Sequence, residues 1–249
     1  NDIEGLEQIF ENYPNQIAAI VMEPTSFKKP EKEFLQKVRK TADANGALLI
    51  LDEVITGFRF DLKGGQKFFD VKGDLVCFGK GMGNGLPISA ITGPNEFMKI
   101  FDELWVSSTN NSEALSLAGT IAVISEMKEK NTISKCWDIG KKIFDGWNKI
   151  TEENNLNSRI SGYSVRMNMQ CYNSENKSSP ELKALILQEM IKNGIFISPS
   201  WLAISYSHTD EDITKTLDIL DNICKKIQNQ VKNENYNEFL EGKMPSTVW

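Results

Sequence analysis

Four short apolar runs in the first part of the chain constrain its fold more than any other feature. They cover residues 17–22, 47–51, 75–78 and 88–92. Each run is nearly continuous rather than alternating, which is typical of strands covered on both faces in a parallel sheet. Between the first two runs, apolar side chains recur at helical spacing over residues 34–42, and Gly46 ends the pattern. The order strand, helix, strand predicts a right-handed βαβ unit and an α/β fold with a mostly parallel sheet.

The sequence changes character near residue 150. Around this point we predict helices at 112–128 and 132–150, a polar break at 154–158, and strand-like runs at 165–171 and 195–198. The pattern therefore predicts part of a larger sheet domain over residues 1–150, followed by a small α+β domain over residues 151–249.

Two helix-start signals lie in the predicted small domain. Ser179-Pro180 has the residue types of an N-cap and a first helical position, and it predicts a helix that runs to Lys192. Thr209 and Asp212 have the spacing of a capping box at the start of a long helix. The Asn- and Glu-rich residues 229–241 predict a loose surface tail.

Composition excludes several function classes. The 249 residues include 28 Lys and Arg against 34 Asp and Glu, and this acidic balance disfavours nucleic-acid binding. No apolar run approaches the roughly 18 residues needed to span a bilayer, and no secretory leader opens the sequence, so we expect a cytoplasmic protein that binds no membrane. Four dispersed cysteines and a single histidine, His208, predict no metal site. We expect His208 to satisfy hydrogen bonds within the small domain.

Three ionisable residues stand where three of the predicted strands end. Glu23 follows the first run, Asp52 the second, and Gly79-Lys80 the third. In an open parallel sheet, ligands bind outside the carboxyl ends of the strands, so these side chains are expected to converge on one crevice. A lysine at the end of a buried strand is costly unless it is paired or used in chemistry.

Two phosphate-binding patterns fail here and a third kind of site fits. Five residues separate Gly73 from Gly79, and Gly81 follows the lysine where a P-loop needs Ser or Thr. The alternating glycines at 79, 81, 83 and 85 do not form a dinucleotide fingerprint either. Pyridoxal phosphate enzymes need a lysine for the aldehyde and an aspartate for the protonated ring nitrogen. Asp52 and Lys80 match that need, and the glycines let the backbone turn sharply around the lysine.

The residues around this pair carry a resemblance. Residues 48–59 (LLILDEVITGFR) and 78–90 (FGKGMGNGLPISA) resemble the signatures of class III pyridoxal-phosphate-dependent aminotransferases of fold type I. The spacing of 28 residues between Asp52 and Lys80 is most similar to the glutamate semialdehyde aminomutase branch. Residues 107–113 and 207–213 are also similar to family segments, so the resemblance covers almost the whole chain. It implies that residues 1–150 are the C-terminal part of a cofactor-binding large domain.

The resemblance implies a role for each matching residue. Lys80 would form the Schiff base with pyridoxal 5'-phosphate and then, kept neutral by burial, would move a proton during the reaction. Asp52 would pair with the ring nitrogen, and Val54 would pack on one face of the ring. Thr109 would bind the cofactor phosphate across a homodimer interface, and Glu23 matches the strand-end motif beside the cofactor.

The chain departs from the family pattern in two places. Asn110-Asn111 stands where the family has a glycine pair after the phosphate-binding threonine. Family members also have a long N-terminal half before the position of Asn1, which supplies a phosphate cup and the second ring-stacking residue. We therefore expect this chain to correspond to the C-terminal part only, either as an engineered or proteolysed fragment or as a piece of a longer polypeptide.

The predicted function is transfer of an amino group between a small-molecule amino donor and a carbonyl acceptor through the Schiff base of Lys80. Two alternatives stay open at this stage. One is the intramolecular amino shift of a glutamate semialdehyde 2,1-aminomutase. The other is an incomplete, non-catalytic half that needs an N-terminal portion or a partner chain. A nucleotide-binding domain is disfavoured because both glycine patterns fail.

Overall fold

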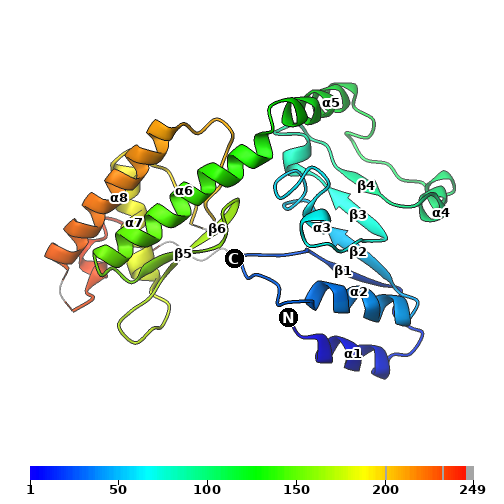
Figure 1. The fold of residues 1–249 in the computed structure, drawn as a ribbon, viewed down its shortest axis with the longest axis horizontal. Helices are drawn as coiled ribbons and strands as arrows, with labels where there is room; N and C mark the ends of the chain where they lie inside the picture. Colours follow the sequence, from blue (N-terminus) through cyan, green and yellow to red (C-terminus); the bar gives the residue numbers. More distant parts are fainter. Residues whose placement is uncertain (200, 232, 245–249) are drawn as a thin grey trace. The chain divides into compact units, whose positions relative to one another are not determined.

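The computed structural model describes residues 1–199, 201–231 and 233–244. The chain forms two compact units, Asn1–Ile133 and Ser134–Trp249 (Figure 1). The boundary predicted near residue 150 falls inside helix α6 (Thr132–Glu153). Ile139, Ile143 and Trp147 of this helix are buried in the core of the second unit. The helix that we placed before the boundary therefore packs mainly with the residues that follow it.

The first unit is built on a sheet of four strands. They are β1 (Ala19–Met22), β2 (Leu48–Asp52), β3 (Leu75–Phe78) and β4 (Ala90–Thr92), in the order β1-β2-β3-β4. The first three strands are parallel, which confirms the prediction of a mostly parallel sheet. The fourth is antiparallel to β3, and the expectation that it continues the parallel set is wrong. Only residues 79–89 join these two strands, which is too short a path for a parallel crossover through a helix.

Helices α1 (Ile3–Asn12) and α2 (Phe34–Ala44) pack on one face of this sheet. The first unit also contains α3 (Gly65–Phe68), α4 (Asn95–Met98) and α5 (Ala114–Glu129), with 3-10 turns η1 (Lys80–Met82) and η2 (Lys99–Asp102). Leu35, Val38 and Ala42 of α2 bury their side chains against Leu49 and Leu51 of β2. Figure 1 shows α2 alongside β1 and β2, with α1 next to α2.

The opposite face of the sheet is only partly covered. Residues of β2 alternate between buried Leu49 and Leu51 and half-buried Leu48 and Ile50, while Val21 of β1 is 67% exposed. The continuous apolar runs predicted strands covered on both faces, and among the described residues this expectation is wrong. Strand register places one set of residues on this side. We call it the open face, and it consists of Ala19, Val21, Leu48, Ile50, Asp52, Leu75, Cys77 and Ile91.

The second unit packs helices against a two-stranded antiparallel sheet. Its elements are α6, β5 (Ser158–Tyr163), β6 (Arg166–Cys171), α7 (Pro180–Lys192), α8 (Asp210–Gln230) and η3 (Tyr236–Phe239). Both predicted helix starts are confirmed. The Ser179 side chain accepts the backbone N–H of Leu182, and Thr209 with Asp212 forms a complete capping box.

Three predictions for this unit need correction. Strand β5 was not predicted, and it begins at the end of the predicted polar break. Its sequence, Ser-Arg-Ile-Ser-Gly-Tyr, contains too few apolar residues to show a strand pattern. Residues 195–198 form no strand. The expected loose tail is instead bound to α7 over residues 239–241. The Gln188 side-chain amide donates to the Phe239 carbonyl at 2.9 Å and accepts the Glu241 N–H at 2.8 Å.

Candidate functional site

Asp52 ends β2 on the open face of the sheet. Its Oδ1 accepts the backbone N–H of Val54 at 3.0 Å, which fixes the orientation of the carboxyl group. Its other oxygen, Oδ2, makes no hydrogen bond with the described residues. Cys77 is the cross-strand neighbour of Asp52. Burial, together with the charge of Asp52, raises the pKa of the Cys77 thiol. Asp52 therefore presents a free acceptor at the carboxyl edge of the sheet.

Lys80 follows β3 at the same edge, in a strained turn. Its φ of +41° lies in the left-handed region, which costs a non-glycine residue on the order of 1 kcal/mol or more. The Lys80 carbonyl accepts the N–H groups of Gly83 and Asn84 at 3.2 and 2.9 Å, so the turn is held by backbone bonds. The side chain is exposed, and no described residue pairs with its amine. The burial that we expected around Lys80 is not supplied by the described residues.

Val54 joins these two strand ends. A Cβ atom placed on Gly79 would lie 3.4 Å from Cγ1 of Val54, so the valine packs directly against the backbone that precedes Lys80. Asp52 is opposite Cys77 in the strand register, and Cys77 stands three positions before Lys80. The structure therefore brings Asp52, Val54 and Lys80 together, and we call these three residues the strand-end cluster.

The other two predicted site residues differ in their positions. Glu23 directly follows β1 and is half-buried, at the same carboxyl edge as the cluster. Its neighbour Pro24 lies close to Gly65, where an added Cβ would be 3.4 Å from the Cβ of the proline. Thr109 lies in an exposed loop between η2 and α5. No contact within the described ranges joins it to the strand-end cluster.

Sequence reasoning missed Glu53, the residue after Asp52. It is fully buried, and its carboxyl accepts hydrogen bonds from Thr56 Oγ1 and from the backbone N–H groups of Gly65 and Gln66. Strand alternation could have found it. Asp52 faces the open side, so the next residue points to the covered side, where an ionisable group needs dedicated partners.

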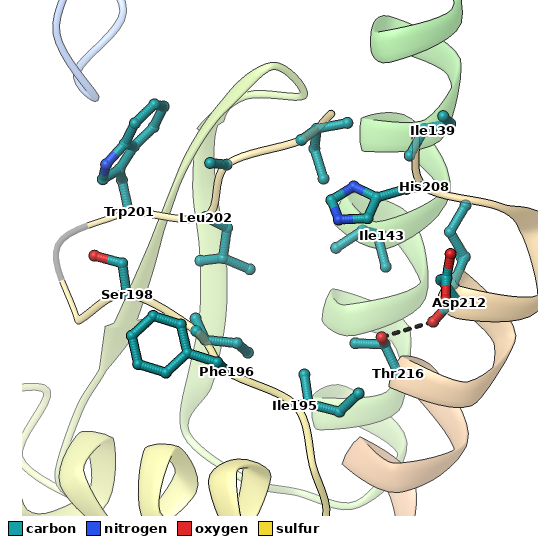
Figure 2. A pocket seen from close by; sticks show the side chains of 14 residues that line it. Ile139, Ile143, Ile195, Phe196, Ser198, Trp201, Leu202, His208, Asp212 and Thr216 are labelled. Carbon is teal, nitrogen blue, oxygen red and sulfur yellow. Dashed lines mark hydrogen bonds between the residues drawn. The ribbon is translucent and has the colours of Figure 1, made fainter. Parts of the chain in front are cut away.

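The second unit contains a pocket of a different kind. Its volume is about 240 Å³, and its lining is mostly apolar, including Ile139, Ile143 and Leu202. Figure 2 shows the His208 ring directed into it. Nδ1 of His208 accepts the backbone N–H of Ser205 at 3.2 Å, which confirms that the histidine satisfies a hydrogen bond within this unit. Among the described lining residues there is no lysine, and the Asp212 carboxyl is already bonded to Thr209 in the capping box, so the strand-end cluster is the stronger candidate site.

Two further observations bear on what the chain can bind. The described part of the chain holds no group of three or more His, Cys, Asp or Glu side chains that could bind a metal ion. Among its helices, none combines the length and the apolar character that crossing a bilayer requires.

The comparison with protein families decides the assignment. The profile of the family described as Aminotransferase class-III matches residues 2–224. This chain belongs to the class III aminotransferase family. The strand-end cluster lies inside the matched range, and so do β1 to β4 and the whole of α7.

Curated members of the family are similar to this class III chain over about half of their length. It is 35% identical over 234 residues to a glutamate-1-semialdehyde 2,1-aminomutase of Alkaliphilus oremlandii, a match that covers 89% of this chain and 55% of the relative. A protein of the same name from Acetivibrio thermocellus is 32% identical over 231 residues, covering 88% and 54%. The chain therefore spans about half the length of the curated relatives that it matches.

Solved structures share the fold of this class III chain. A transaminase with PLP bound superposes with a TM-score of 0.83 at 21% identity, covering 92% of this chain and 57% of that one. An omega-transaminase from Sphaerobacter thermophilus gives 0.81 at 21% identity, covering 92% and 56%. At this level of identity the likeness shows the fold, including the mixed, mostly parallel sheet.

Proposed function

We propose that the protein containing this chain binds pyridoxal 5'-phosphate at the strand-end cluster and transfers an amino group between an amino donor and a carbonyl acceptor. The observation that carries the proposal is the meeting of Asp52 and Lys80 at the ends of two adjacent parallel strands. Family membership supports it, as does a transaminase of the same fold that is described with PLP bound.

The residues of the cluster fit this cofactor. The Oδ2 atom of Asp52 is a free acceptor for a protonated ring nitrogen, and a carboxylate facing a cation forms a strong, charge-assisted hydrogen bond. Val54 offers an apolar surface for the ring, and Gly79 leaves the approach to it open because it has no side chain. The Lys80 amine is exposed and unpaired within the described residues, so it is available to hold an aldehyde.

Each residue then has a distinct task. When bound, the cofactor supplies an electron sink for the bond that breaks at the substrate carbon. Asp52 would accept a hydrogen bond from the protonated ring nitrogen, and Val54 would pack on the ring. Lys80 is the proposed Schiff-base lysine: its Nζ would hold the aldehyde and, as a free amine, would move a proton to or from the substrate carbon. Glu23, at the edge of β1, is proposed to lie beside the cofactor.

An intramolecular amino shift is the second candidate reaction. The curated relatives at 35% and 32% identity are named as aminomutases, and this observation favours the candidate. Both reactions use Asp52 and Lys80 in the same way and differ in whether the amino group returns to the same molecule. Incubation of the purified protein with glutamate-1-semialdehyde, against an amino donor with a separate keto acid, distinguishes them by the products.

A homodimer is proposed on two grounds. Thr109 lies away from the strand-end cluster, in accord with phosphate binding to the cofactor of a second copy. Large apolar side chains near this loop are exposed, with Trp105 94%, Leu115 69% and Ile121 69% accessible, which is typical of an interface. Sedimentation should show a dimer, and a monomer with full cofactor affinity would contradict the proposal. A cytoplasmic location stays a prediction, which cell fractionation can test.

The direct test of the proposed function is a cofactor titration. Pyridoxal 5'-phosphate added to the chain should produce an imine absorbance band, and Lys80→Ala should abolish the band. Loss of the band in the variant supports the Schiff base. Absence of a band in the unaltered chain at saturating cofactor would contradict binding by this chain alone. That result would favour the reading that it is a non-catalytic half which needs an N-terminal portion or a partner chain.

A further inference from the structure

The carboxyl group of Glu53 is buried, and both of its oxygens accept hydrogen bonds. Oε2 accepts the Thr56 hydroxyl at 2.7 Å and the Gly65 N–H, and Oε1 accepts the Gln66 N–H at 2.7 Å. These donors lie 3, 12 and 13 positions further along the chain. A carboxyl group with no exposure is stable only when hydrogen bonds replace its water. Glu53 therefore closes the loop of residues 53–66 onto the end of β2.

Glycine makes this closure possible. Gly64 has a φ of +85°, and a Cβ atom on it would lie 2.5 Å from Oε1 of Glu53. A Cβ atom on Gly65 would lie 3.2 Å from Oε2. Any side chain at position 64 would both strain the backbone and displace the carboxyl group.

The loop that Glu53 holds is the surface on which the Lys80 segment rests. The N–H of Glu53 donates to the Cys77 carbonyl at 2.8 Å, and Val54 packs on Gly79. The backbone of Gly57 lies against the Phe78 ring, where a Cβ would be 2.5 Å from Cδ1. Residues 53–58 therefore contact residues 77–81 along their length, from the hydrogen bond at the Cys77 carbonyl to the turn at Lys80.

We propose that Glu53 is a positioning residue for Lys80. Its carboxyl group holds the 53–66 loop in place, and this loop in turn fixes the left-handed turn of Lys80 at the same sheet edge as Asp52. Glu53 faces the covered side of the sheet, so it acts through the backbone and not on bound molecules. The catalytic meaning of this role rests on the proposed function, whereas the coupling between the two loops can be measured without a cofactor.

Native-state hydrogen exchange on the purified chain tests the coupling. In Glu53→Gln, the new amide NH₂ must face a backbone N–H whichever way it is turned. The amides of Gly65 and Gln66 should then exchange about tenfold faster. If Glu53→Gln folds poorly, Thr56→Val serves in its place. It removes one donor with little change in shape, and the exchange of the Gly65 and Gln66 amides should increase less, about threefold.

The decisive amides are those of residues 82–84. They bond to the carbonyls of Gly79 and Lys80 and make no contact with Glu53. We expect them to exchange faster together with Gly65 in both variants. Faster exchange at Gly65 alone, with residues 82–84 unchanged, would overturn the proposal, because Glu53 would then support only its own loop.

Matched controls separate this effect from general destabilisation. Gly64→Ala should reproduce the pattern of Glu53→Gln. Gly46→Ala should not, because Gly46 has a φ of +65° but nothing within 4 Å of an added Cβ. Glu189→Gln alters another buried carboxyl, bonded to Lys226 in the second unit, and should leave residues 82–84 unchanged.

A cofactor titration of the same variants adds a spectroscopic readout. Pyridoxal 5'-phosphate should bind Glu53→Gln more weakly than the unaltered chain, by about tenfold, and Glu189→Gln equally well. Equal affinity in Glu53→Gln would overturn the positioning role. If the unaltered chain itself shows no imine band, the proposed function of this chain fails, whereas the exchange result still decides whether Glu53 couples the loops.

Discussion

The core of the second unit and the open face of the first unit use apolar residues in opposite ways. In the second unit Trp147, Leu182 and Met190 are fully buried, and both predicted helix starts are capped. On the open face Val21 is 67% exposed, and the amine of Lys80 has no partner among the described residues. The comparison teaches that one region serves stability, while the other keeps polar groups free and a turn strained, as sites of chemistry do.

The largest expected difference is in stability. Trp147→Ala should lower the free energy of unfolding by about 3–5 kcal/mol, because it leaves a large cavity in a close-packed core. Val21→Ala should change it by less than about 0.5 kcal/mol, because that side chain is already exposed. Urea unfolding of both variants measures this difference. Equal losses in the free energy of unfolding would contradict the comparison between the two regions.

Alkaline pH should weaken the second unit through its buried thiols. Burial raises the pKa of Cys171 to about 11 and of Cys224 to about 12. A thiol in the unfolded chain has a pKa of about 8.5. The contribution of the buried thiols to the free energy of unfolding is therefore complete below that pH and declines as the pH rises toward 11. The expected loss is about 1–3 kcal/mol between pH 8 and pH 10.

Unfolding by urea across this pH range measures the decline. Cys224→Ala is the matched variant, because its packing cost is the same at every pH while its alkaline slope should be smaller. An identical slope in the variant would show that the thiol does not contribute. Cys77 lies outside this core, on the open face, and provides the comparison within the first unit.

Replacement of Asp52 should affect binding more than folding. Asp52→Asn keeps the shape but loses the charge that faces the ring nitrogen, so the affinity for pyridoxal 5'-phosphate should fall about tenfold. Absorbance titration measures this change. Asp138→Asn, at an exposed position of α6, should bind as the unaltered chain does. Equal affinity of the two variants for pyridoxal 5'-phosphate would show that Asp52 does not contact the cofactor.

The sequence predicted well those features that depend on local chemistry. Ser179-Pro180 and the Thr209–Asp212 box start helices where expected, since capping needs only residues a few positions apart. The apolar runs and the Asp and Lys that follow them predicted the parallel strands and the cluster at their ends.

Features that depend on distant partners could not be predicted. The reversal of β4 is an exception, because the short interval between the apolar runs at 75–78 and 88–92 already disfavours a parallel crossover. The binding of the C-terminal segment depends on remote partners, which include the Gln188 side chain and the apolar core against which Phe239 and Leu240 pack. Strand alternation indicates that Glu53 faces the covered side, but its donors Gly65 and Gln66 could not be predicted, because only the fold of a loop brings them to it.

Borohydride trapping tests the central claim most directly. The chain is mixed with pyridoxal 5'-phosphate, reduced, digested and mapped by mass spectrometry. The account predicts that the cofactor label is found on the peptide that contains Lys80, and that Asp52→Asn reduces this label while labelling of Lys72, an exposed lysine in the same unit, is unchanged. Equal labelling of Lys72 and Lys80, independent of Asp52, would contradict it.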